Sequence, residues 1–165
     1  MQSLTFYRIL TWFLLIVGGF LAFFLVAGLL MALANPVLLL PLFVLACVLI
    51  YTYASWRFLS RGIDAHLYCK RSLRDLIRVN GYGALFFASL SLVQAISLIV
   101  QPSLLQDTMD QALALQKNQV EGMEATMWKV MHFTLRFMTA YSIVLIIHIF
   151  MTFRLIRQHA DAFDA

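Results

Sequence analysis

The sequence predicts an all-α integral membrane protein, built as a four-helix transmembrane bundle. The chain is 62% hydrophobic with a mean hydropathy of +0.86, whereas apolar residues make up roughly half of an ordinary soluble domain. Between Arg8 and Arg57 it contains no Asp, Glu, Lys, Arg or His. The apolar runs are also continuous rather than alternating with a period of two, which excludes a transmembrane β-barrel.

The uncharged run in the first third of the chain predicts two spans joined by a turn. As a single helix it would reach about 72 Å, more than twice the roughly 30 Å hydrocarbon core of a bilayer. Proline disfavours helical geometry in the residue before it, and asparagine tolerates a tight bend, so Asn35-Pro36 marks the turn. We expect spans over about 10–33 and 37–56. The first is too long for the core of a cleaved export signal, so we expect it to be retained.

The second half predicts two more spans, over about 82–101 and 128–153. Both segments are long and apolar, and aromatic residues near several proposed ends are typical of interface anchors. Residues 1–165 are therefore expected to form a single membrane domain. Small residues at helical spacing indicate close helix packing: Gly18 and Ala22 in the first span, and Ala84, Ala88, Ser91 and Ala95 in the third.

The connection 57–80 is predicted to contain a short amphipathic helix. Ser72 followed by Asp75 resembles a helix capping box, and apolar residues follow at helical spacing. Such a helix would lie at the level of the lipid headgroups. Three arginines share its polar side and are candidates for contact with an anionic lipid or a partner protein, or they serve only to fix topology: Arg71, Arg74 and Arg78.

The distribution of basic residues predicts that both termini lie in the cytoplasm. In a four-span arrangement nine lysines and arginines flank one side of the membrane, and only Lys117 and Lys129 flank the other. Such an excess in short segments marks the cytoplasmic side. The segment 102–127 would then lie outside, where Pro102 can begin a helix that caps the bundle. The expected location is the inner, cytoplasmic membrane of a cell, with multiple passes.

No signature of catalysis is present. The chain lacks HExxH, GxSxG and P-loop motifs, and no Asp or Glu lies in a proposed span. The net charge of +4 comes from residues that flank the spans, so it indicates topology rather than nucleic-acid binding. Cys47 and Cys69 form neither a CxxC pair nor a zinc spacing. We expect no enzymatic activity, no catalytic residue, no cofactor or metal, and no nucleic-acid partner.

A methionine stripe in the last span needs separate consideration. Met123, Met127 and Met131 recur every four residues beside His132. Thioethers and imidazole suit Cu(I), but a methionine stripe at helical spacing is more often adaptable packing. Copper binding therefore stays open as the weaker interpretation. Haem is disfavoured because the only other histidine in a span, His148, lies on the same helix.

Arg136 lies inside the last predicted span, where a charge is costly unless it reaches water or a polar partner. It either snorkels outward past His132, or it forms a polar site with His132 and Gln94. For function we favour a non-enzymatic accessory or interaction subunit of a larger membrane complex, in contact with lipids, anionic ones among them, and with other subunits or copies of itself. The alternative is a small oligomeric transporter or channel with a polar lining around Arg136.

Overall fold

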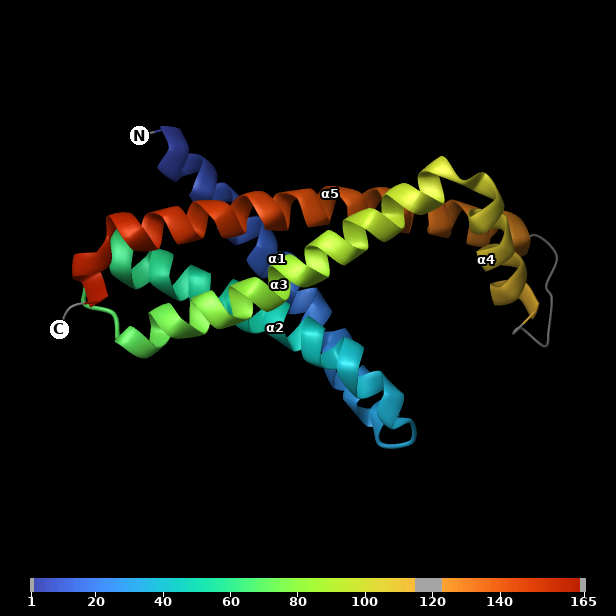
Figure 1. The fold of residues 1–165 in the computed structure, drawn as a ribbon, viewed down its shortest axis with the longest axis horizontal. Helices are drawn as coiled ribbons and strands as arrows, with labels where there is room; N and C mark the ends of the chain where they lie inside the picture. The colour runs from blue at the N-terminus through green and yellow to red at the C-terminus, as the bar shows by residue number, and fades with distance from the viewer. Residues whose placement is uncertain (1, 115–122, 164–165) are drawn as a thin grey trace. The chain divides into compact units, whose positions relative to one another are not determined.

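The computed structural model describes residues 2–114 and 123–163, and every regular element in these ranges is helical (Figure 1). Four of the helical segments are long and apolar enough to cross a membrane. The predicted all-α class is therefore confirmed for the described part of the chain. In order, the elements are α1 (Gln2–Ala32), the 3-10 turn η1 (Pro36–Leu38), α2 (Leu39–Arg57), the π-helix η2 (Phe58–Asp64), α3 (Arg71–Val100), α4 (Pro102–Ala114), α5 (Met123–Gln158) and the 3-10 turn η3 (Ala160–Phe163).

The predicted turn between the first two spans is confirmed. Asn35 is extended, with φ −139°, and its side-chain Oδ1 accepts a hydrogen bond of 3.2 Å from the Val37 amide. Figure 1 shows α1 and α2 running side by side from this turn. A glycine permits their close approach, because a Cβ added at Gly18 would lie 3.4 Å from Thr52 Cγ2.

The structure corrects the predicted connection 57–80. It holds no separate amphipathic helix, because α2 continues as η2 to Asp64, and α3 runs unbroken from Arg71 to Val100. The three arginines Arg71, Arg74 and Arg78 therefore lie in the first turns of a long helix. The physical reason is that a continuous helix keeps its backbone groups paired within the segment as the chain enters the apolar region. Only residues 65–70 remain irregular.

The predicted outer segment 102–127 is helical in part. It begins with α4, which starts at Pro102 as expected and buries Leu105 and Met109. Its later part is described again from Met123, where α5 begins. Lys117, which the orientation argument used, lies outside the described residues.

Contacts divide the chain into two compact units: the first consists of Met1–Phe87 and Val144–Ala165, and the second of Ala88–Ile143. The first unit buries large side chains from α1, α2, η2, α3 and α5. The second buries small residues of α3, Leu105 and Met109 of α4, and Tyr141 and Ser142 of α5. Outward faces carry large apolar side chains, such as Ile16 at 72% and Phe23 at 71% exposure. A lipid environment accommodates that surface without the cost that water would impose.

Candidate functional site

A cluster of polar side chains lies inside the first unit, surrounded by apolar residues. It will be called the hydroxyl–imidazole cluster, and each of its members is 0% exposed. Because an unpaired polar group in such a place is costly, the pairing of these groups decides what the cluster can do. Its members are Tyr7 and Thr11 of α1, Tyr51 of α2, and His148 and Thr152 of α5.

His148 is held through both ring nitrogens. Its Nδ1 lies 2.8 Å from Tyr51 Oη, and its Nε2 lies 2.9 Å from Thr11 Oγ1. The ring of Tyr7 stacks on the imidazole with 4.8 Å between centroids and 7° between planes. Thr152 joins the two tyrosines, since its Oγ1 lies 2.9 Å from Tyr51 Oη and 3.1 Å from Tyr7 Oη.

Counting protons shows that the hydroxyl–imidazole cluster is satisfied with a neutral imidazole. If Nε2 carries the proton, it donates to Thr11, which donates onward to the carbonyl of Tyr7 at 2.8 Å. The Tyr51 hydroxyl then donates to Nδ1. If Nδ1 carries the proton, Thr11 donates to Nε2 instead, and Tyr51 donates to Thr152. With the proton on Nδ1, Thr152 donates to the carbonyl of His148 at 2.8 Å, and with the proton on Nε2 it donates to Tyr51 instead. The cluster thus links three helices, and in either arrangement one of its hydroxyls donates to a backbone carbonyl, that of Tyr7 or that of His148.

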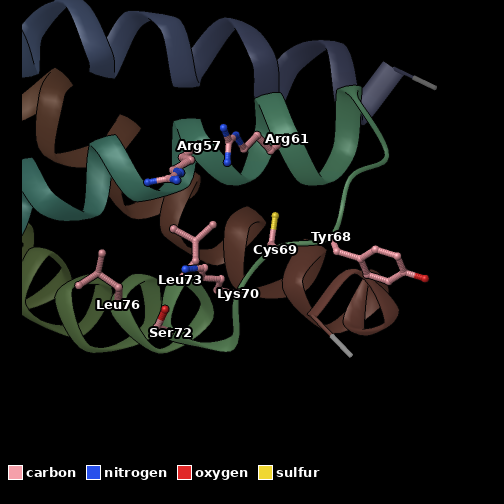
Figure 2. Close-up of a pocket in the computed structure, with 8 residues that line it drawn as sticks. All are labelled: Arg57, Arg61, Tyr68, Cys69, Lys70, Ser72, Leu73 and Leu76. Carbon is pink, nitrogen blue, oxygen red and sulfur yellow. The ribbon is translucent and has the colours of Figure 1, made fainter. Parts of the chain in front are cut away.

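The three arginines predicted to contact lipid or a partner are not among the residues that line the cavity nearest to them along the chain. Arg71 and Arg78 are exposed, and Arg74 is half-buried with its Nε 3.7 Å from a carboxylate oxygen of Asp75. A cavity of about 340 Å³ does lie beside them, and Figure 2 shows the side chains that surround it. The cationic side chains that line it belong to other residues, which were predicted only to set the orientation in the membrane: Arg57, Arg61 and Lys70.

The second unit places two of the three residues of the predicted polar site together. His132 and Arg136, one turn apart on α5, line a cavity of about 270 Å³ whose other walls are apolar side chains of α3, α4 and α5 and Pro102. The His132 ring also stacks near Trp128, with 5.7 Å between centroids. Gln94 is exposed and is not among the residues that line this cavity.

The methionine stripe is divided from its histidine. Met127 and Met131 line a nearly apolar cavity of about 440 Å³ together with Met109 of α4. His132 does not line this cavity and lines the cavity of about 270 Å³ instead. Among residues 2–114 and 123–163, no group of three or more His, Cys, Asp and Glu is placed to hold a metal ion.

Comparisons of the chain with protein-family models, with curated proteins and with solved structures found no match. Three of the sites described above bear on function. These are the hydroxyl–imidazole cluster, the cavity of about 340 Å³ lined by Arg57, Arg61 and Lys70, and the cavity lined by His132 and Arg136.

Proposed function

We propose that the chain is a multi-pass membrane protein that acts as a non-enzymatic accessory or interaction subunit of a larger membrane complex. The four long apolar helices and the excess of lysine and arginine on one side support membrane placement with both termini in the cytoplasm. The single observation that carries the subunit role is the internal pairing of the hydroxyl–imidazole cluster.

A channel or transporter needs polar groups that water, an ion or a solute can reach. In the hydroxyl–imidazole cluster the buried hydroxyls and the imidazole hydrogen-bond to one another across α1, α2 and α5 instead. Hydrogen bonds of this kind hold membrane helices together. The cluster is therefore suited to fixing the first unit, while the exposed apolar faces of its helices are available to lipid or to other membrane helices.

One observation favours a second candidate function, a small oligomeric transporter or channel. The cavity that contains His132 and Arg136 combines two basic side chains with apolar walls. In an oligomer, a neighbouring copy could complete such a cavity as part of an anion pathway. This candidate predicts a requirement for the guanidinium of Arg136 during transport.

The two functions differ in what the purified chain does alone. As a subunit, the chain should be recovered from mild detergent in a stoichiometric complex larger than itself, and should support no anion flux after reconstitution into liposomes. Saturable anion flux by the chain alone, lost in Arg136→Leu, would overturn the subunit proposal in favour of transport. Membrane placement is tested separately by reporter fusions after Ala114 and after Ala165, which should report outside and cytoplasm respectively.

A further inference from the structure

The first unit contains a second polar feature, distinct from the hydroxyl–imidazole cluster and open to the surface. We propose that this feature, the basic pocket of about 340 Å³, binds the phosphate headgroup of an anionic phospholipid (Figure 2). Its volume falls within the roughly 300–1,000 Å³ of small-ligand sites. The residues that line it are Arg57, Arg61, Tyr68, Cys69, Lys70, Ser72, Leu73 and Leu76.

The charged side chains that line the basic pocket are all positive. Arg57 ends α2, Arg61 lies one turn later in η2, and Lys70 comes from the irregular link, so three cations from three segments meet at one cavity. No carboxylate lines it. The two nearest acidic residues along the chain are occupied elsewhere: Asp64 accepts hydrogen bonds from Arg8 Nε at 3.1 Å and Nη2 at 2.5 Å, and Asp75 lies beside Arg74.

The link that carries Lys70 is held in place. The backbone amide of Cys69 donates a 2.7 Å hydrogen bond to the carbonyl of Ala162, and its side chain is 5% exposed. Gly62 leaves room for it, because a Cβ there would lie 3.3 Å from Cys69 Sγ. Burial raises the pKa of the Cys69 thiol, which Arg61 and Arg57 only partly offset. The pocket therefore offers fixed cations and an uncharged thiol rather than a reactive thiolate.

The polar groups of the basic pocket match a phosphate. Guanidinium groups bind phosphate oxygens in a bidentate manner, and the Ser72 hydroxyl can donate a further hydrogen bond. An isolated sulfate or phosphate would need nothing more. Figure 2 shows that Leu73 and Leu76, on the first turns of α3, add an apolar wall facing the segment that carries Arg57. Charged and apolar walls together fit a headgroup attached to acyl chains.

The position of the basic pocket supports the same ligand. It lies where the second candidate span, Pro36–Asp64, ends and the third, Arg71–Val100, begins. That is the side to which the basic residues assign the cytoplasm, and basic pockets between membrane helices on that side bind acidic lipid headgroups. The inference shares membrane placement with the proposed function but does not depend on the subunit role.

The test uses the full-length chain purified in a non-ionic detergent and titrated with a short-chain phosphatidylglycerol, with binding followed by native mass spectrometry. The variant Arg57→Gln/Arg61→Gln removes two pocket cations. The matched control Arg71→Gln/Arg78→Gln removes the same charge from exposed positions that do not line the pocket. Phosphatidylcholine of the same chain length and inorganic phosphate serve as competitors.

Saturable one-to-one binding of phosphatidylglycerol is expected, weakened at least about tenfold in the pocket variant and less than about threefold in the control. If both variants bind the lipid equally weakly, the lipid is attracted by the overall surface charge, and the proposed site is wrong. Inorganic phosphate that binds as tightly as the lipid, or phosphatidylcholine that competes equally, would overturn the lipid headgroup as ligand.

The arginine-to-glutamine variant could fail to fold, so a conservative variant keeps the proposal testable. Arg57→Lys/Arg61→Lys retains both charges but loses the planar guanidinium fork. We expect it to elute as wild type in gel filtration and to bind phosphatidylglycerol at least about threefold more weakly. Unchanged affinity in this variant would show that the guanidinium groups do not form bidentate hydrogen bonds with the phosphate, which contradicts the proposed geometry.

Discussion

Removing the hydroxyl of Tyr51 tests whether the hydroxyl–imidazole cluster stabilises the fold. Tyr51→Phe deletes one oxygen from a fully buried ring and leaves the volume of the side chain nearly unchanged. That oxygen lies 2.8 Å from His148 Nδ1 and 2.9 Å from Thr152 Oγ1. The substitution therefore removes two hydrogen bonds between α2 and α5 without creating a large cavity.

The expected cost follows from these two bonds. A hydrogen bond between membrane helices contributes on average about 0.6 kcal/mol and at most about 1.7 kcal/mol, so two of them give about 1–3 kcal/mol. His148 can move its proton to Nε2 and leave Nδ1 as an unpaired acceptor, which avoids the larger penalty of a buried unpaired donor. We therefore expect Tyr51→Phe to lower the free energy of unfolding by about 1–3 kcal/mol.

The measurement is reversible unfolding of the purified chain in mixed micelles, with Tyr53→Phe as the matched control. Tyr53 lies two residues away on α2 and is 51% exposed, so its hydroxyl should matter by less than about 0.5 kcal/mol. A double-mutant cycle of Tyr51→Phe with Thr152→Val should show a coupling of at least about 0.5 kcal/mol. Equal stability of the two Tyr→Phe variants, or no coupling, would refute a stabilising role for the cluster.

Two further predictions concern tight packing and the buried thiol. Gly83→Ala should lower the free energy of unfolding by about 1–3 kcal/mol, because the new Cβ would lie 2.9 Å from Cys47 Cβ. In the same assay the control Gly19→Ala should be neutral or stabilising, because no atom lies within 4 Å of the new Cβ. In a Cys47→Ser background, iodoacetamide should alkylate Cys69 with a pH midpoint above that of the SDS-unfolded chain, because burial raises the thiol pKa, and Arg61→Gln should raise the midpoint further. A midpoint equal to that of the unfolded chain would contradict burial of the thiol.

Several elements follow directly from the sequence. The Asn35-Pro36 turn is predictable because a proline and a side-chain acceptor act on their immediate neighbours, and the structure confirms it. The four long apolar helices are predictable because hydrophobic length alone indicates them. The end of a predicted span is less certain, and α5 extends beyond the predicted 128–153 at both ends because helical propensity continues past the apolar core.

The polar sites were harder to predict because they depend on contacts between helices. A signal for the hydroxyl–imidazole cluster does exist in the sequence: Tyr7 and Thr11, and likewise His148 and Thr152, lie four residues apart and so share a helix face within apolar segments. From the sequence alone, His148 was expected to matter only as a haem ligand, and haem was disfavoured. Tyr51 bonds to both members of the second pair, and this depends on the packing of α2, which no local pattern reveals.

The cationic residues show the same limit. Helical spacing correctly places Arg71, Arg74 and Arg78 on one helix, but the lining of a cavity depends on a neighbouring segment. The π-helix η2 brings Arg61 to the cavity, and a π-helical continuation of α2 has no signature in the sequence that we could use. His132 and Arg136 line one cavity because they are one turn apart on α5, whereas the position of Gln94 depends on the rotation of another helix.

The last prediction concerns substitutions at Arg136, and the expected effect depends on where Arg136 lies along α5. Within α5, the stretch 137–153 contains no Asp, Glu, Lys or Arg. It spans about 25 Å, close to the thickness of the hydrocarbon core. Arg136 then lies at the edge of that stretch rather than deep within it. Its side chain is exposed and makes no hydrogen bond or ion pair with another described residue. These facts favour an arginine that reaches water or headgroups beside His132.

We therefore expect Arg136→Lys to be silent, and Arg136→Leu to leave the free energy of unfolding within about 0.5 kcal/mol of wild type or slightly above it. Recovery of the larger complex should also be unchanged in both variants. If the guanidinium instead binds an anion or a partner, lysine cannot reproduce its planar fork, and even the conservative change should impair recovery or flux. Loss of either property in both variants, with stability retained, would show that Arg136 is a binding residue rather than one that snorkels.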